Sequence, residues 1–372
     1  MNKKMSIGIL FIIFLLLSQP TISIYNLRGS EGASFGQTAY LLKASKSIWN
    51  RNDDLKLATE KIVENFPIKK LSVSLISEFE YRIFNRSNNV IVGEDGFLSD
   101  KVVVEQLLEL DKMQEDDFKE PIRRLKNITE YLGNRGQNFL VVIVPLKPTI
   151  YKEKFPGPVS ERQNIGLFKF QGEMQKNNIQ FVDLHNTLYK ARNKHVIYHK
   201  TDVHWNNVGS AIAVKEIINY LSIATYGKKL YTEEYTTSSM KFIGGESTSM
   251  ALLKPISETY IKWNAKPSYY IETEVNESGD GLEKFFGTDP NKAILPKTLM
   301  FGNSYMNYYR DAGLQNYFKE FDQVLDYSSF KNFTKIVSAK YELVVLNIYE
   351  SQILFHMIEG DNYNYWPNDL LD

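Results

Sequence analysis

The stretch FLVVIVP, from Phe139 to Pro145, decides the fold class of this chain. Its apolar residues are continuous rather than alternating with polar ones, and such runs are typical of parallel strands buried on both faces. Three shorter segments are predicted to be strands of the same sheet: IQFVDL (179–184), TLMFG (298–302) and ELVVLN (342–347). We therefore predict a mostly parallel sheet with helices packed against both of its faces.

Segments with helical spacing lie between these predicted strands. Residues 101–134 carry apolar side chains at intervals of three and four, which predicts helix. A second helix is predicted over residues 206–223, where Asn206 or Asn207 would serve as the N-cap. Because strands alternate with helices along the chain, the sequence predicts a three-layer α/β fold.

The organisation of the chain around this sheet is predicted from its composition. Residues 25–88 are polar, with amphipathic helical stretches, and are interpreted as an N-terminal extension. VIVGEDGFLS then predicts a strand and a glycine turn that open the main domain, residues 89–372. Within it, residues 225–292 are rich in Tyr, Ser and Gly and are interpreted as a long insertion with little clear pattern.

The first residues have the pattern of an export signal. Lys3 and Lys4 precede an apolar run from Ile7 to Leu17, as in the charged and apolar regions of a secretory signal. Residues 1–24 are therefore predicted to be a cleaved signal peptide or an uncleaved membrane anchor. In both cases the positive end stays inside and the rest of the chain faces outward. A buried N-terminal helix is the third interpretation.

Charge and cysteine content exclude several classes of function. Lys plus Arg and Asp plus Glu both total 44, so the formal net charge is zero and no basic surface for nucleic acid is indicated. The chain contains no cysteine, which excludes disulfides, thiolate nucleophiles and cysteine-ligated metals. We predict no nucleic-acid partner and no cofactor.

Two segments at the ends of predicted elements carry residues suited to nucleophilic catalysis. YHKTDVHWNN contains His199, Asp202 and His204, and LMFGNSYM places Ser304 at a strand-to-helix turn. A serine at such a turn exposes its hydroxyl beside backbone N–H groups that can hold an oxyanion. Serine is a weak nucleophile that needs an imidazole base, itself oriented by a carboxylate. The two segments together supply all three groups.

Simpler interpretations of the same residues stay open. Ser304 alone could be the N-cap of a helix, and an Asp-x-His pair is often a structural contact. His199, Asp202 and His204 together could instead bind a metal ion such as zinc.

Four segments, taken together, resemble a known family. They occur in the order found in the alginate O-acetyltransferases of AlgX/AlgJ type, and the PatB-type cell-wall O-acetyltransferases are similar. These segments are GEDGFL (93–98), VPLKPTIYKEKFP (144–156), TDVHWNNVG (201–209) and FGNSYM (301–306). The resemblance covers roughly residues 90–350. It implies an SGNH-hydrolase-like, flavodoxin-like fold that is circularly permuted, so that Asp-x-His-Trp precedes Gly-x-Ser.

The resemblance also implies roles for individual residues. Asp202 would orient His204, His204 would act as the base, and Ser304 would be the nucleophile. Asn303 and Tyr305 stand where the family usually has Asp and Phe, and these two departures leave the triad residues themselves in place. Five more residues are expected at the oxyanion hole or the substrate: Gly302, Asn347, Trp205, Lys147 and Tyr151. For Lys147 and Tyr151 an ordinary place on the rim is the alternative, and for Trp205 core packing.

The expected activity is transfer of acetyl groups to a cell-surface polysaccharide. The resemblance implies that the acetyl donor is handed over by a membrane-embedded acyltransferase partner. A carbohydrate O-acetylesterase would use the same triad, and a non-catalytic polysaccharide-binding or assembly protein could keep the same fold. The sequence leaves the acceptor polysaccharide open.

Overall fold

The computed structural model describes residues 67–266, 269–275, 281–287, 293–325 and 327–354, together with Pro367 and Leu370. The predicted signal or anchor, residues 1–24, lies outside these described residues, as does most of the predicted N-terminal extension. The chain divides into two compact units, one of residues 1–87 with 250–255 and one of residues 88–249 with 256–372. The described part of the first unit contains helix α4 (Pro67–Phe84). No helix among the described residues has the length and apolar character needed to cross a membrane.

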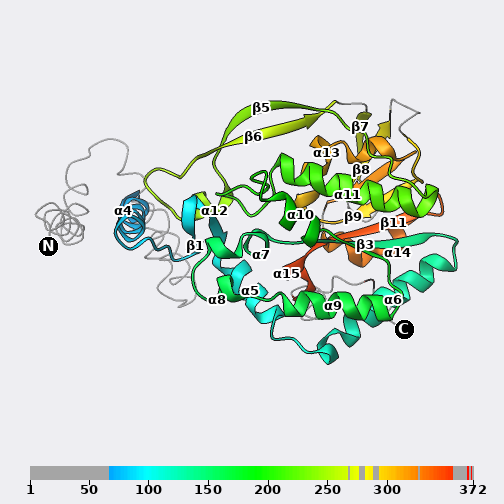
Figure 1. The fold of residues 1–372 in the computed structure, drawn as a ribbon, viewed down its shortest axis with the longest axis horizontal. Helices are drawn as coiled ribbons and strands as arrows, with labels where there is room; N and C mark the ends of the chain where they lie inside the picture. Colours follow the sequence, from blue (N-terminus) through cyan, green and yellow to red (C-terminus); the bar gives the residue numbers. More distant parts are fainter. Residues whose placement is uncertain are drawn as a thin grey trace, which may run out of the picture. The chain divides into compact units, whose positions relative to one another are not determined.

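A mixed, mostly parallel sheet forms the centre of the second unit (Figure 1). Within the described residues it has seven strands in the order β4-β3-β11-β9-β10-β8-β7. The first five pair in parallel, whereas β8 and β7 are antiparallel additions at the β10 edge. The strands are β3 (Asn138–Val144), β4 (Phe181–Asp183), β7 (Tyr269–Val275), β8 (Gly281–Gly287), β9 (Thr298–Phe301), β10 (Phe321–Val324) and β11 (Leu343–Tyr349). The prediction of a mostly parallel α/β sheet is confirmed.

Alternate side chains of β3 enter two separate hydrophobic cores. Val142 packs in the cluster that contains residues of helix α11 (Asn207–Tyr226). Val141 packs in the cluster built on helices α6 (Lys119–Gly133) and α9 (Ile165–Lys176). Figure 1 shows α11 on one side of the sheet and α6 with α9 on the other. The continuous apolar run of β3 therefore follows from burial on both faces.

The predicted helices are largely confirmed. Residues 101–134 form two helices, α5 (Lys101–Leu110) and α6, separated by a short 3-10 turn at Glu115–Phe118. The helix predicted at 206–223 is α11, and the Asn206 side chain accepts hydrogen bonds from the N–H groups of the second and third helical residues. Gly227, with a φ of 69°, ends it in the left-handed conformation that suits glycine.

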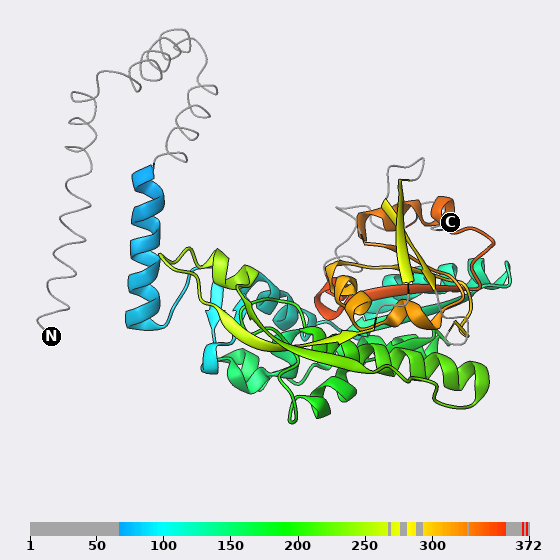
Figure 2. The ribbon, with the colours of Figure 1, turned by 90° about the horizontal axis from the view of Figure 1, so that it is seen from above.

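The segment interpreted as an insertion, residues 225–292, contains regular strands in its described part. Strands β5 (Tyr235–Phe242) and β6 (Glu258–Ala265) pair as a long antiparallel ribbon that passes over α11, and β7 with β8 extends the main sheet (Figure 2). Most residues of β5 are exposed. A ribbon with little apolar surface to bury has no strong hydrophobic period for sequence analysis to detect.

The entry to the main domain is a tight turn, as predicted from VIVGEDGFLS. Strands β1 (Val90–Val92) and β2 (Leu98–Asp100) pair antiparallel around it. The N–H of Leu98 donates a 2.7 Å hydrogen bond to the carbonyl of Lys200, which ties the entry to the loop of the Asp-x-His motif.

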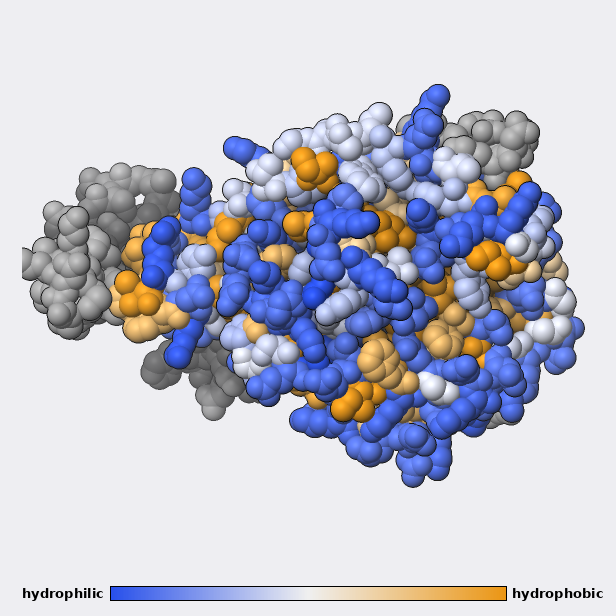
Figure 3. Space-filling model, in the orientation of Figure 1, coloured by the Kyte–Doolittle hydropathy of each residue, from blue (hydrophilic) through white to orange (hydrophobic). Residues whose placement is uncertain are grey.

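Hydrophilic side chains cover most of the face drawn in Figure 3, and hydrophobic ones form only small separate patches there.

Candidate active site

The Asp-x-His segment is a closed loop that immediately precedes α11. An isolated antiparallel bridge joins Tyr198 to Trp205, and the His199 N–H donates to the His204 carbonyl at 3.1 Å. Ser304 follows β9 and opens the short 3-10 helix η4 (Ser304–Met306). The side chain of Asn303 caps this turn by accepting a 3.0 Å bond from the Tyr305 N–H. Both segments therefore lie at the ends of elements, where α/β sheets place their sites.

The structure brings Ser304, His204 and Asp202 into one hydrogen-bonded chain. The Ser304 hydroxyl oxygen lies 2.7 Å from His204 Nε2, and His204 Nδ1 lies 2.6 Å from Asp202 Oδ1. The carboxylate selects the tautomer with its proton on Nδ1, so that Nε2 accepts from the serine hydroxyl. Ser304 is exposed, whereas the other two are half-buried. The geometry is that of a Ser-His-Asp triad, and the catalytic roles of its members stay predictions.

Asp202 is held as a carboxylate by its surroundings. Its Oδ1 accepts from the backbone N–H of His204 at 3.1 Å, and its Oδ2 accepts from the N–H of Gly245 at 2.8 Å. Partial burial of the carboxyl group opposes ionisation. The hydrogen bonds from His204 and Gly245 outweigh it and hold the pKa of Asp202 below its usual value. Gly245 begins helix α12 (Gly245–Ser249), in the segment interpreted as an insertion.

Lys147 is buried, so the alternative of a place on the rim is wrong. Its ammonium group donates to the carbonyl oxygens of His199, Lys200 and Asp202 at 3.1, 3.2 and 2.6 Å. It also lies 3.5 Å from a carboxylate oxygen of Glu246, itself 4% exposed. Burial lowers the pKa of Lys147 and raises that of Glu246, and their mutual attraction opposes both shifts. Lys147 contacts the triad loop rather than the open cleft.

Tyr151 and Trp205 are also core residues. Tyr151 is 6% exposed, and its hydroxyl oxygen accepts a 3.1 Å bond from the Ile197 N–H just before the motif loop. Trp205 is fully buried, and its indole N–H donates to the Tyr305 carbonyl at 3.3 Å. Core packing is therefore correct for Trp205, because a ring without exposed surface has no face for a sugar.

Gly302 has no room for a side chain. A Cβ atom at this position would overlap the sulfur of Met306 and lie 3.1 Å from Cβ of Asn347. Asn347 is fully buried, and its Oδ1 accepts a 2.8 Å bond from the Tyr309 hydroxyl. Its Nδ2 is buried and donates to none of the described residues. The oxyanion roles of both residues stay predictions.

Asn347→Ala is expected to lower turnover of an activated acetyl ester by about a hundred- to a thousandfold. The reason is that one oxyanion donor contributes roughly this much in other acyl transfers. Because the Tyr309 hydroxyl would lose its acceptor, the melting temperature of the variant is measured alongside. Near-normal turnover by a stable variant would show that the oxyanion donors lie elsewhere.

The three residues of the zinc alternative do not form a metal site. His199 is fully buried, with its ring stacked 4.1 Å from that of Phe242 and Nδ1 lying 3.5 Å from a carboxylate oxygen of Glu258. Asp202 and His204 are instead bonded to each other. Among the described residues, no three or more His, Asp or Glu side chains are grouped so that they could hold a metal ion.

An open cleft of about 470 Å³ lies over the triad. One wall is a polar network that sequence analysis did not identify. Asn207 Nδ2 donates to Asp311 at 2.9 Å, the Tyr260 hydroxyl donates to Asn207 Oδ1 at 3.3 Å, and the Lys262 ammonium lies 3.1 Å from Asp311. Tyr260 and Lys262 belong to β6, in the segment predicted to be an insertion. No pattern in the sequence pointed to them, because only the pairing of β6 with β5 brings them to the cleft.

The strand order and the position of the triad make the second unit an SGNH-hydrolase-like α/β protein. The chain belongs to the family described as SGNH hydrolase-like domain, acetyltransferase AlgX, whose model matches residues 90–328.

Curated relatives and solved structures are similar to this chain over the same region. A probable alginate O-acetylase AlgJ of Pseudomonas putida is 20% identical over 249 residues, which cover 65% of this chain and 63% of the relative. The corresponding protein of Azotobacter vinelandii is 25% identical over 213 residues, 53% of this chain and 48% of the relative. The chain thus spans about half the length of the curated relatives it matches.

Two solved structures share the fold. The O-acetyltransferase domain of Pseudomonas putida AlgJ superposes with a TM-score of 0.50 and 15% identity, covering 77% of this chain and 98% of that domain. Bacillus cereus PatB1 with a sulfonyl adduct superposes with a TM-score of 0.53 and 14% identity, covering 72% of this chain and 97% of that one.

Proposed function

We propose that this protein transfers acetyl groups to hydroxyls of a polysaccharide through an acetylated Ser304. The observation that carries the proposal is the chain of short hydrogen bonds from Asp202 through His204 to an exposed serine hydroxyl, at 2.6 and 2.7 Å. Membership of an acetyltransferase family supports the same chemistry.

In the first step the Ser304 oxygen attacks the acetyl carbonyl while His204 Nε2 accepts the hydroxyl proton. The negative oxygen of the tetrahedral intermediate needs donors. The Ser304 N–H at the start of η4 is the candidate there, because the N–H groups of Tyr305 and Met306 already donate to Asn303. Collapse of the intermediate breaks the bond to the donor's oxygen, which takes the proton from His204. The acetyl group is then an ester of Ser304.

In the second step a sugar hydroxyl attacks this ester. His204 accepts the sugar's proton and returns it to the serine oxygen as the acetyl bond to Ser304 breaks. Asp202 stabilises the imidazolium that forms in both steps. Water reaching the same ester would give an esterase, and the exposure of Ser304 is the specific observation in favour of that second candidate.

The purified chain, incubated with 4-nitrophenyl acetate with and without an oligosaccharide, separates the candidates. Acetylated sugar formed in proportion to acceptor supports transfer. Rapid release of acetate that is indifferent to acceptor identifies an esterase. A folded protein that releases no nitrophenolate above background would be the non-catalytic polysaccharide-binding protein.

We further propose that the triad works outside the cell membrane. The support is the charged and apolar pattern of residues 1–24, which fits a signal or an anchor. The acetyl donor would then come from a membrane-embedded acyltransferase partner, since activated acetyl compounds are made inside the cell.

Protease added to wall-stripped intact cells is expected to digest the chain beyond residue 25. The measurement is an immunoblot of the second unit, with a cytoplasmic protein as the control for intact membranes. Full protection of the second unit in intact cells, with digestion after lysis, would place the triad inside and contradict the proposal.

A further inference from the structure

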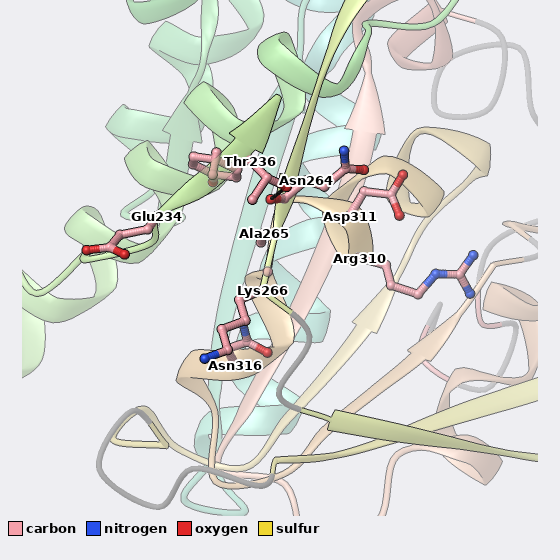
Figure 4. Close-up of a pocket in the computed structure, with 10 residues that line it drawn as sticks. Glu234, Thr236, Asn264, Ala265, Lys266, Arg310, Asp311 and Asn316 are labelled. Atoms are coloured by element: carbon pink, nitrogen blue, oxygen red, sulfur yellow. Dashed lines mark hydrogen bonds between the residues drawn. The ribbon is translucent and has the colours of Figure 1, made fainter. Parts of the chain in front are cut away.

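A second hollow (Figure 4) has a volume of about 590 Å³ and adjoins the cleft over Ser304. It lies between the base of the β5–β6 ribbon, helix α13 (Asn307–Asp311) and the 3-10 turn η5 (Leu314–Tyr317). Arg310 and Asp311 line both the hollow and the cleft over Ser304, so the two spaces share one wall. The volume is in the range of sites that bind small molecules.

One buried side-chain amide at this hollow has an unpaired oxygen. Asn316 is 2% exposed, and its Nδ2 donates to Glu233 at 3.0 Å. Its Oδ1 accepts from none of the described residues. A buried acceptor without a donor costs free energy, so such a group points to a ligand or solvent that supplies the donor. Figure 4 shows Asn316 and Lys266 toward one end of the hollow and Asn264 with Asp311 toward the other.

The polar groups that line the hollow can form hydrogen bonds with hydroxyl groups of a ligand. Asn264 contributes a second side-chain amide to the lining of the hollow. An amide offers both a donor and an acceptor, as a sugar hydroxyl does, so the two complement each other. Gly313, at a φ of 81°, leaves the space beside Asn316 that a side chain would occupy.

The charges along the combined cleft and hollow cancel. Three cationic side chains and three carboxylates line the two spaces: Lys262, Lys266 and Arg310, and Asp202, Glu234 and Asp311. An acidic polymer would be expected to meet an excess of Lys and Arg, because charge complementarity supports specificity. The balance favours a neutral ligand.

We propose that this hollow binds a sugar residue of the acceptor chain next to the one acetylated at Ser304, and that the acceptor is a neutral, hydroxyl-rich glycan. Asn316 Oδ1 accepts a hydrogen bond from one hydroxyl of that sugar, and the Asn264 side chain hydrogen-bonds a second hydroxyl. This inference rests on the proposed function. It adds that the acceptor spans at least two sugar residues and carries no net charge.

Calorimetry with the whole protein and no acetyl donor tests the subsite without any turnover. The probes are neutral cello- and chito-oligosaccharides of one to five sugars and oligo-uronates of the same lengths. The dissociation constant of the neutral series is expected to fall by about tenfold once the chain occupies both spaces, the gain from one or two further hydrogen bonds. The monosaccharide contacts only one space and gains nothing from the other.

Two variants test whether the gain in affinity with chain length arises in this hollow. Thr236→Trp places a ring at the exposed edge of the hollow and is expected to abolish the gain with length. Asn316→Ala removes the unpaired acceptor and is expected to reduce that gain. Ser239→Trp is the matched control, because Ser239 is exposed on the same strand and does not line the hollow. It should bind like the parent.

The outcomes are distinct from those of the acetyl-transfer assay. Dissociation constants independent of length in both neutral series, or a gain that survives Thr236→Trp, would overturn the subsite. Preferential binding of oligo-uronates would overturn the neutral class of acceptor. Absence of nitrophenolate release with length-dependent binding intact would instead count against the acetylated Ser304 and leave the subsite standing.

Discussion

Ser304→Ala is expected to abolish release of nitrophenolate from 4-nitrophenyl acetate, a loss of roughly ten-thousandfold or more in turnover. The hydroxyl oxygen that would carry the acetyl group is removed, and among the described residues Ser304 is the hydrogen-bond partner of His204 Nε2. Because Ser304 is exposed, the substitution leaves no cavity and the melting temperature should not change. Mass spectrometry of the intact protein should detect an acetyl adduct on the parent and none on the variant.

The double variant Ser304→Ala/His204→Ala tests whether the three residues act together as a triad or are only polar neighbours. Groups that act as a unit are grossly non-additive, so the double loss should equal the larger single loss. Ser239→Ala, which removes an exposed hydroxyl on β5, is the control and should keep full turnover. Additive losses, or an acetyl adduct that persists in Ser304→Ala, would show that the nucleophile lies elsewhere.

Lys147→Met is expected to lower the free energy of unfolding by about 3–5 kcal/mol, the usual effect of removing one partner of a buried ion pair. Methionine keeps the apolar stem but leaves Glu246 as a buried unpaired carboxyl. Three carbonyls of the motif loop lose their donor as well. The expected loss is a large fraction of the stability of an ordinary domain. Urea unfolding followed by circular dichroism measures it.

A second substitution separates the charge from the packing. Adding Glu246→Gln to Lys147→Met removes the unpaired carboxyl and should recover part of the lost stability. Lys147→Arg is not conservative here, because a planar guanidinium does not fit three carbonyls converging on one ammonium. Lys215→Met, at an exposed position of α11, is the control and should unfold like the parent. A change below about 0.5 kcal/mol for Lys147→Met would show that the pair contributes little.

Much of the sheet could be predicted because local sequence carried the signal. In β3 and β11 a continuous apolar run reflects burial on both faces, and in α11 an N-cap side chain marks the first turn. Strand β10 was not predicted. Its buried Asp322 accepts hydrogen bonds from Lys340 and Tyr341, and such distant partners are invisible in a four-residue segment.

The motif residues determined which chemistry to expect, because only a few side-chain types can activate a serine and Asp202, His204 and Ser304 supply them. The tertiary structure decided that these three side chains lie within hydrogen-bonding distance of one another. A hundred residues separate His204 from Ser304, and the order of parallel strands brings the end of β9 beside the loop before α11. The same holds for Lys147, whose burial depends on the motif loop and α12 closing around it. Residue type is a local property, whereas distance and burial arise from contacts between segments far apart in the chain.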